Sequence, residues 1–366
     1  MTDQPRNMFR APIEKMAPYV PGEQPRSGQH LIKLNTNENP YPPSPRVRRA
    51  VARAAGATLR LYPPPHADEF VAAAARVYRI RPDMIVAGNG SDELLAMLFR
   101  AALGRGDRVA YATPTYSLYD TLASIQEARV VTVPFAAGFT MPLQGLARAA
   151  ARLTVVCNPN SPSGSFTAPD DLAVLARALD GRLLAIDEAY VDFAASNALH
   201  LLKHHRNVVV LRSLSKSFSL AGMRLGLCFA PPEIARELRK VKDSYNLSRI
   251  AVIAGAAALD DVAWMRRNVE RVKRTRASCE KRLRAMGFEV PSSSTNFVLA
   301  RMAGRDLAPM AAALRRRGIL VRHFPTSVFR DALRISIGTP AEMTALFRAL
   351  EPLARRLDLA LNNGRA

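Results

Sequence analysis

Two periodicities of apolar residues alternate along the chain from about residue 50 to residue 211. Short β-branched runs, which are typical of buried strands, are separated by longer segments in which apolar residues recur at every third or fourth position. This alternation predicts an α/β domain whose mainly parallel sheet is covered by helices. The predicted strands are 84–87, 108–112, 130–133, 153–157, 183–186 and 208–211, and the predicted helices are 68–78, 91–103, 115–127 and 169–180.

The pattern changes beyond about residue 255. A long Arg-rich amphipathic stretch at 260–286 is followed by short elements with short connections, which indicates a smaller α+β unit. Its predicted strands are 297–299, 319–322 and 333–336, and its later predicted helices are 306–317 and 340–356.

A chain of 366 residues exceeds the usual size of one domain, so we expect two domains. Residues 1–45 are rich in Pro and Asn and show little periodicity, which is typical of an arm that wraps over another surface. We therefore divide the chain into an arm at 1–45, which packs on the small domain or on a partner subunit, a large domain at 46–255 and a small domain at 256–366.

The composition predicts a globular, cytoplasmic protein without a membrane span. Charged residues, Gly or Pro interrupt every apolar stretch well before the roughly 20 residues that a bilayer requires. Residues 1–20 lack the apolar run of a secretory signal, and Cys157, Cys228 and Cys279 form no short-spaced pair, which suits a reducing compartment. The six histidines accompany no HExxH or CxxC motif, so we expect no metal.

The formal charge of +21 raises the question of an anionic partner. Of the 52 basic residues only eight are lysine, and the arginines are spread through helical patterns such as 266–284 without interleaved aromatic residues. No nucleic-acid-binding motif accompanies them. We interpret the charge as an arginine-rich coding bias combined with a small anionic ligand, and we expect no nucleic-acid partner.

A glycine-rich turn at 88–93 joins a predicted strand to the apolar helix that follows it. Free backbone N–H groups and the positive end of the helix converge there, which favours a phosphate near Gly90, Ser91 and Asp92. The same Gly-x-Gly-Ser-Asp sequence is also a good helix N-cap, so the turn alone leaves both interpretations open.

Asp187 closes the predicted strand 183–186 at its carboxyl end, which is where ligands bind in open α/β sheets. A carboxylate beside a pyridine nitrogen keeps that ring protonated, as pyridoxal phosphate needs in order to act as an electron sink. The alternative is an aspartate that caps a loop between a strand and a helix.

The segment 212–226 carries the most specific pattern in the chain. Lys216 lies among small hydroxyl residues just after a predicted strand, and Arg224 follows eight residues later. A lysine amine in such a place can form a Schiff base with an aldehyde. Ser213, Ser215 and Arg224 offer phosphate donors, with Arg224 as the charge-assisted one. We therefore predict that Lys216 holds pyridoxal phosphate.

Eight motifs in this order resemble the fold-type I pyridoxal-phosphate aminotransferases, and within them the histidinol-phosphate aminotransferases, from near residue 30 to near residue 340. The resemblance implies a large domain with a mainly parallel sheet, a small α+β domain and a homodimer. Ser161 and Ser163 stand where the family usually has Asn and Thr. The motifs are Leu34–Pro40, Tyr62-Pro63, Gly88–Glu93, Pro114–Tyr116, Asn158–Gly164, Asp187–Tyr190, Ser213–Arg224 and Arg334–Gly338.

The resemblance also implies roles for individual residues. Lys216, Asp187 and Tyr190 are the implied catalytic residues: Lys216 forms the imine and moves the proton, Asp187 contacts the pyridine nitrogen, and Tyr190 joins Asn158 on the ring hydroxyl. Tyr116 stacks on the ring. The cofactor phosphate is held by Gly90, Ser91, Asp92, Ser213, Ser215 and Arg224, and Tyr62 reaches it from the neighbouring subunit. The substrate is bound by Tyr19, Asn37, Arg322 and Arg334.

The implied reaction is a ping-pong transamination between histidinol phosphate and 2-oxoglutarate, a step of histidine biosynthesis. Three alternatives stay open. An aromatic amino acid aminotransferase and a phosphothreonine decarboxylase share the scaffold and its motifs. A nucleic-acid-binding regulator is suggested only by the charge, and no helix-turn-helix module precedes residue 30.

Overall fold

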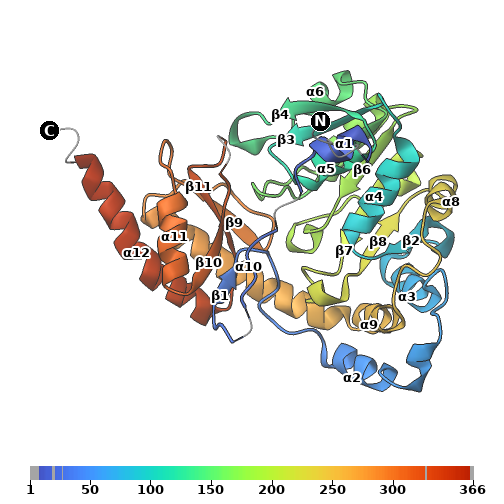
Figure 1. Cartoon of the computed structure of the whole chain (residues 1–366), viewed down its shortest axis with the longest axis horizontal. Coiled ribbons are helices and arrows are strands. Elements are labelled where there is room, and N and C mark those ends of the chain that lie inside the picture. The colour runs from blue at the N-terminus through green and yellow to red at the C-terminus, as the bar shows by residue number, and fades with distance from the viewer. Residues whose placement is uncertain (1–7, 19–20, 27, 326–327, 363–366) are drawn as a thin grey trace, which may run out of the picture.

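A computed structural model describes residues 8–18, 21–26, 28–325 and 328–362 of the chain (Figure 1). Its larger sheet has seven strands, and only β8 runs antiparallel to both of its neighbours, β2 and β7. The prediction of a mainly parallel α/β sheet is therefore confirmed. The strand order is β2 (Ile85–Gly88), β8 (Gly226–Phe229), β7 (Val208–Ser213), β6 (Leu183–Asp187), β5 (Leu153–Cys157), β3 (Arg108–Thr113) and β4 (Arg129–Pro134).

Helices cover both faces of this sheet because its central strands are apolar on both sides. Adjacent residues on one strand enter different cores, as Val155 and Val156 do on β5. One core contains side chains of α4 (Ser91–Ala102), α5 (Leu118–Ile125) and α8 (Pro232–Lys240). The other contains side chains of α3 (Asp68–Tyr78), α6 (Leu143–Arg148), α7 (Pro169–Ala178) and α9 (Arg249–Leu259).

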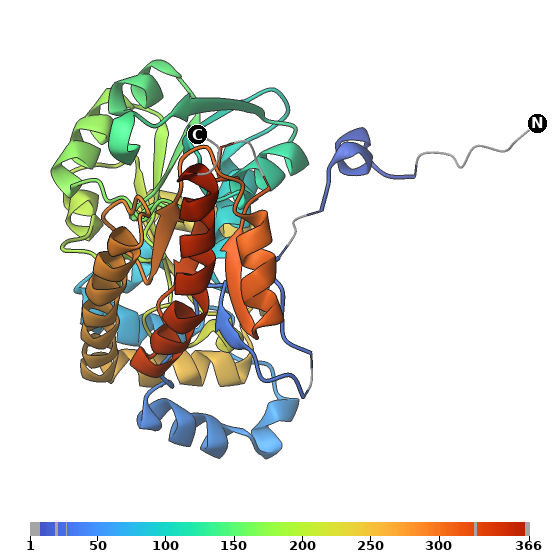
Figure 2. The ribbon, with the colours of Figure 1, turned by 90° about the vertical axis from the view of Figure 1, so that its left-hand side faces the viewer.

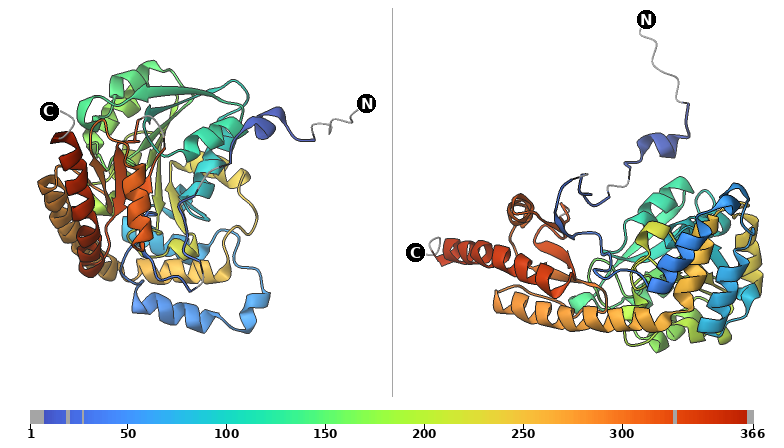
Figure 3. Two further views of the ribbon diagram at one scale, coloured as in Figure 1. Left: turned by 60° about the vertical axis from the view of Figure 1, so that its left-hand side comes forward. Right: turned by 90° about the horizontal axis from the view of Figure 1, so that it is seen from below.

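The smaller sheet has the strand order β1 (Ile32–Leu34), β10 (Ile319–His323), β11 (Ala332–Ser336) and β9 (Phe297–Arg301). Figure 2 shows α11 (Ala308–Arg316) and α12 (Pro340–Asn362), in orange and red, in front of this sheet. The long helix α10 (Val262–Ala285) runs from the helices of the large sheet to a position beside α12 (Figure 3). This part of the chain is the α+β unit that the sequence predicts.

The N-terminal segment contains structure that the hydrophobic pattern does not predict. β1 pairs in parallel with β10, with Ile32 opposite Ile319, and thereby becomes an edge of the small sheet. The short helix α1 (Ala11–Lys15) lies instead against α5, where Arg10 Nη2 donates to Ile125 O at 3.0 Å. We propose that the segment before residue 46 belongs with the small domain through β1.

Several further elements differ from the expected ones. The helices α2 (Pro45–Ala54), α6, α8 and α9 and the strand β8 were not predicted, and the helix expected at 115–127 is shortened to α5. α9 is rich in alanine and buried on most sides. It therefore lacks the polar face that would produce a helical period of apolar residues in the sequence. Within the described residues, no helix combines the length and the apolarity needed to cross a bilayer.

Candidate active site

A cavity of about 730 Å³ lies between the carboxyl ends of the large sheet and the small sheet. Four adjacent parallel strands end at its wall, as the topology of an open α/β sheet requires of a ligand site. Their last residues are Thr113 of β3, Cys157 of β5, Asp187 of β6 and Ser213 of β7, and all four line the cavity.

Lys216 lies on the wall of this cavity, three residues after β7 ends. Its Nζ donates to Thr36 O at 3.2 Å and lies 5.8 Å from the ring centre of Tyr190. The pKa of Lys216 is lowered to about 8, mainly by burial. The charges of Arg334 and Arg224 act in the same direction, while those of Glu38 and Asp92 act against it. The amine therefore becomes neutral and nucleophilic at a pH closer to neutrality than the amine of an exposed lysine does.

Asp187 is almost completely buried at the end of β6, with 2% of its surface exposed. Tyr119 donates its hydroxyl to Oδ2 at 2.8 Å, and the N–H of Ala189 donates to Oδ1 at 3.2 Å. Burial raises the pKa of Asp187 to about 6, against the lowering effect of the Tyr119 hydrogen bond. The carboxylate is thus held in one orientation and ionises close to neutral pH.

The start of α4 and the segment after β7 form a cradle suited to phosphate. Arg224 Nη2 donates to Asp92 Oδ2 at 2.9 Å, and Nη1 donates to Ser215 Oγ at 3.3 Å. Tyr116 also donates to the Asp92 carboxylate, at 3.3 Å. That carboxylate cannot donate to a phosphate, so only the backbone N–H of Asp92 is available for that purpose, together with Ser91 at the helix N-terminus.

Glycines make this cradle possible. Gly90 has φ +85°, and a Cβ there would lie 2.7 Å from Arg224 Nη2. A Cβ on Gly226 would lie 2.5 Å from the carbonyl carbon of Gly90. Only hydrogen fits at either position, so the backbone before α4 approaches both β8 and the arginine closely.

Tyr190 and Asn37 form a buried network on the small-domain side. Asn37 Nδ2 donates to Tyr190 Oη at 2.9 Å, while Ser336 Oγ donates to Asn37 Oδ1 at 2.9 Å. Asn296 Nδ2 donates to Asn37 O at 2.8 Å and supports the left-handed backbone at Asn37, where φ is +60°. Burial raises the pKa of Tyr190, so its hydroxyl keeps its proton and can donate it to a ligand.

Arg322 and Arg334 are directly opposite each other on β10 and β11, and both line the cavity. Arg334 Nη2 donates to Asn35 O at 2.9 Å and Nη1 donates to Ser161 Oγ at 3.2 Å. The guanidinium carbon of each arginine lies 5.5 Å from the ring centre of Phe324. Two planar cations on neighbouring strands suit an anionic substrate group.

Besides Gly90, two of the predicted site residues that the structure describes do not line this cavity. Asn158 is buried beside it, where its amide donates to Thr167 O at 2.9 Å and accepts from Thr167 N at 2.8 Å. Tyr62 is 77% exposed and stacks on Tyr245 with ring centres 4.5 Å apart. Tyr19 falls outside the described residues.

The remaining predicted residues meet at this cavity. Gly90 lies directly behind it, against Arg224. The others line it: Ser91, Asp92, Tyr116, Asp187, Tyr190, Ser213, Ser215, Lys216, Arg224, Asn37, Arg322 and Arg334.

The sequence analysis assigned no role to several residues that support the site. Tyr119, which holds Asp187, is one of them, although its place on an inward helix position is a signal that helical periodicity could have supplied. Asn39 Nδ2 donates to Lys216 O at 3.0 Å and fixes the loop of the lysine. Behind the site, Arg212 and Glu188 form a buried ion pair at 2.9 Å.

Comparison with known proteins shows the family of the chain. The family profile described as aminotransferase class I and II matches residues 29–350. The chain belongs to this family. The histidinol-phosphate aminotransferase 1 of Trichormus variabilis is 43% identical to this aminotransferase over 95% of the chain and 99% of the relative. The histidinol-phosphate aminotransferase of Citrifermentans bemidjiense is 46% identical over 94% of the chain and 98% of the relative.

Solved structures give the same result for the fold. The histidinol-phosphate aminotransferase of Sinorhizobium meliloti, in complex with pyridoxal-5'-phosphate, matches the aminotransferase with a TM-score of 0.88 and 30% identity. That match covers 96% of this chain and 98% of the other. The sequence-based assignment to the fold-type I aminotransferases is therefore confirmed.

Proposed function

We propose that this aminotransferase transfers an amino group from histidinol phosphate to 2-oxoglutarate in histidine biosynthesis. The observation that carries the proposal is the pair Arg322 and Arg334, which face each other across two strands in the cavity of Lys216. Two guanidinium groups suit a substrate that brings a phosphate in one half-reaction and a carboxylate in the other. The relatives that carry this name span almost the whole chain.

The enzyme uses pyridoxal phosphate, the group bound in the Sinorhizobium meliloti relative. The residues of the cavity fit it, because the Gly90 cradle beside Arg224 suits a phosphate and the buried Asp187 suits a protonated ring nitrogen. When bound, the cofactor supplies an aldehyde that condenses with amines and a pyridine ring that takes up electrons. Asn158, whose amide keeps one N–H beyond its bond to Thr167, and Tyr190 supply donors for the ring hydroxyl.

The chain's own residues handle the substrate and its protons. Lys216 Nζ, when neutral, would take the proton from the donor carbon that carries the amine, and in the second half-reaction its protonated form would deliver a proton to the corresponding carbon of the acceptor. The Asp187 carboxylate would stabilise a protonated ring nitrogen of the bound cofactor, and Tyr119 keeps this carboxylate in place through its hydrogen bond. Arg322 and Arg334 orient the anionic end of the substrate so that its amine faces Lys216.

Steady-state kinetics with two amino donors tests this function. We expect kcat/KM for histidinol phosphate to exceed that for phenylalanine or tyrosine by about a hundredfold or more, because only the phosphate ester engages both arginines with a dianion. Equal values would instead support an aromatic amino acid aminotransferase. Release of carbon dioxide from phosphothreonine would support a decarboxylase. The names of the relatives favour neither alternative.

We also propose a homodimer in which Tyr62 reaches the cofactor phosphate of the partner subunit. Tyr62 is highly exposed and does not line the cavity of its own chain, yet Tyr245 and Arg249, which donates to Tyr62 O at 2.8 Å, hold it in place. An ordered and exposed aromatic side chain is typical of an interface. All three cysteines are buried and free, in keeping with our proposal that the enzyme works in the cytoplasm.

A further inference from the structure

Phe324 lies just beyond the end of β10 and lines the cavity of Lys216. The guanidinium carbons of Arg322 and Arg334 lie over its ring, each 5.5 Å from the ring centre. A guanidinium within about 6 Å of a ring centre is attracted to the ring face, which carries negative charge density. One aromatic side chain therefore contacts both cations of the arginine pair in the cavity.

Strand register brings these three side chains together. Arg322 and Arg334 are directly opposite each other on β10 and β11. Phe324 follows Arg322 by two positions, and side chains two positions apart in an extended chain point to the same face of a sheet. The ring therefore lies on the same side of the small sheet as the two guanidinium groups.

A row of four aromatic rings holds Phe324 in place. Its ring centre lies 5.9 Å from that of Phe329, which is only 3% exposed. Phe329 stacks on Phe139 with ring centres 6.3 Å apart, and Phe139 contacts Phe135 with ring centres 6.1 Å apart. Phe139 follows β4 of the large sheet, whereas Phe329 precedes β11 of the small sheet. The ring of Phe324 is thus anchored where segments of the two sheets meet.

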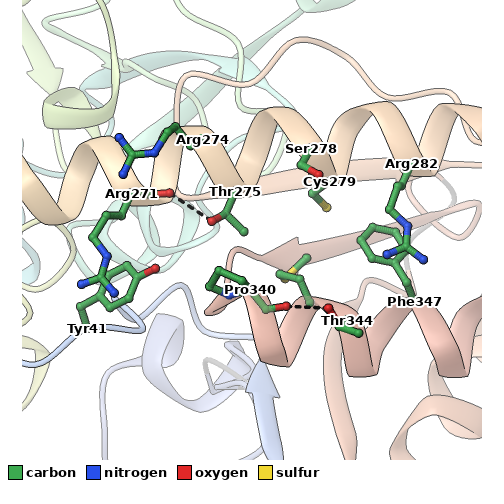
Figure 4. A pocket seen from close by; sticks show the side chains of 11 residues that line it. Tyr41, Arg271, Arg274, Thr275, Ser278, Cys279, Arg282, Pro340, Thr344 and Phe347 are labelled. Carbon is green, nitrogen blue, oxygen red and sulfur yellow. Dashed lines mark hydrogen bonds between the residues drawn. The ribbon is translucent and has the colours of Figure 1, made fainter.

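Arginine lies against an aromatic ring elsewhere in the chain as well. Between α10 and α12, the guanidinium carbon of Arg271 lies 3.4 Å from the ring centre of Tyr41. In the same groove, the guanidinium carbon of Arg282 lies 4.0 Å from the ring centre of Phe347 (Figure 4). Both of these arginines are exposed, and neither lines the active-site cavity. The contact at Phe324 differs because both of its arginines line that cavity.

We propose that Phe324 is a positioning residue that sets the affinity of the cavity for the anionic group of the substrate. An aromatic ring occupies the face of a guanidinium and leaves the N–H groups at its edge for hydrogen bonds. Ordering two long side chains before the substrate arrives lowers the entropic cost of binding. Phe324 acts through the arginines and not on the reacting atoms. The inference rests on the proposed function, in which Arg322 and Arg334 bind the substrate anion.

Half-reactions of the holoenzyme with histidinol phosphate test this role. Rapid-mixing measurements of the cofactor absorbance give the dissociation constant of the substrate and the rate constant at saturation separately. We expect Phe324→Leu, which keeps an apolar side chain but loses the aromatic face, to raise the dissociation constant about five- to tenfold. The rate constant at saturation should stay within about twofold, because only binding is weakened. Phe324→Tyr keeps the ring at this half-buried position and should restore the parent dissociation constant.

Phe135→Leu is the matched control. It makes the same change at the far end of the row of rings, where Phe135 contacts Phe139, so both constants should equal those of the parent. The proposal is overturned if Phe324→Leu binds histidinol phosphate as tightly as the parent, if its defect lies in the rate constant alone, or if Phe135→Leu weakens binding equally.

The proposed function and the role of Phe324 can fail separately. A parent enzyme that does not react with histidinol phosphate would contradict the proposed function. The same comparison of variants with glutamate, whose carboxylate also requires a cationic partner, then decides on Phe324: an unchanged dissociation constant in Phe324→Leu overturns its role, and a raised one supports it.

Discussion

At the scale of single residues, burial moves the pKa values of two groups with opposite charge toward neutral pH. It lowers the pKa of Lys216 to about 8 and raises that of Asp187 to about 6. Between these values the carboxylate is charged, while the amine loses its proton as the pH approaches 8. The cavity therefore provides a base and an anion at the same pH.

The first prediction concerns the pH dependence of cofactor uptake by the apoenzyme. The rate should rise with pH and level off above about 8, because only the neutral amine of Lys216 attacks an aldehyde. Rapid-mixing absorbance measurements with pyridoxal phosphate give this profile. Glu38→Gln removes a negative charge that raises the pKa of Lys216, so the midpoint should move to lower pH. A rate that still climbs near pH 10 would show an unperturbed lysine.

A second prediction concerns Tyr119, which the sequence motifs missed. Its hydroxyl lowers the pKa of Asp187, so Tyr119→Phe should raise that pKa further and move the acidic limb of the kcat profile to higher pH. We expect kcat to fall about tenfold at pH 6, in line with the loss of one hydrogen bond to a charged group. Tyr111→Phe, which removes a hydroxyl bonded to Asp120 in the same cavity, is the control and should leave the limb in place.

Short motifs reveal the site residues whose chemistry is indicated by their neighbours in sequence, but not the contacts that depend on packing. Lys216, Asp187 and Arg224 each lie in a local pattern that indicates their chemistry, and all three line one cavity. The opposition of Arg322 and Arg334 depends on strand register, which no local pattern of this chain specifies. The same holds for Tyr119, whose contact with Asp187 depends on how a helix packs on the sheet.

At the scale of elements, the hydrophobic pattern predicted six of the strands of the large sheet but not β8. β8 is short, and it follows the polar segment of Lys216 rather than a helix. Its antiparallel direction breaks the alternation on which the prediction rested. The sequence also missed β1, because three residues in a Pro- and Asn-rich segment give no detectable period.

The junction of β2 and α4 yields the third prediction. Gly90→Ala should lower the affinity for pyridoxal phosphate at least about tenfold, because the methyl group meets Arg224 in the cradle and the positive φ adds strain. Equilibrium dialysis of the cofactor measures this loss. Gly106→Ala is the control: Gly106 has φ +84° but open space around it, so strain alone acts there. Equal affinities in the two variants would contradict a cradle at Gly90.

At the scale of the whole molecule, the cavity of Lys216 lies between the large sheet and the small sheet. The long helix α10 runs from the helices of the large sheet to the small domain (Figure 3). Three of the arginines behind the net charge of +21 line that cavity, namely Arg224, Arg322 and Arg334. The arginine content of the sequence indicated a small anionic ligand, but only the packing of strands and helices brings particular arginines together.

The fourth prediction tests the proposed dimer through subunit mixing. Tyr62→Ala and Lys216→Ala homodimers should each be impaired, the first in cofactor retention and the second in turnover. In a mixed dimer, the subunit with Tyr62→Ala keeps its own lysine and receives Tyr62 from its partner, so one intact site forms. After random exchange about half of the dimers are mixed and each of these has one intact site of two. Activity should therefore return to about a quarter of the wild-type value. An absence of recovery, with exchange shown by mass spectrometry, would contradict a shared site.

The pairing of β1 with β10 has a consequence for biosynthesis. Ile32 leaves the ribosome long before its partner Ile319, which lies 287 positions later in the sequence. The first strand of the chain must therefore wait, with its edge open, while the large sheet folds next to the exit tunnel. Nascent chains that stall before β10 would present that edge to chaperones.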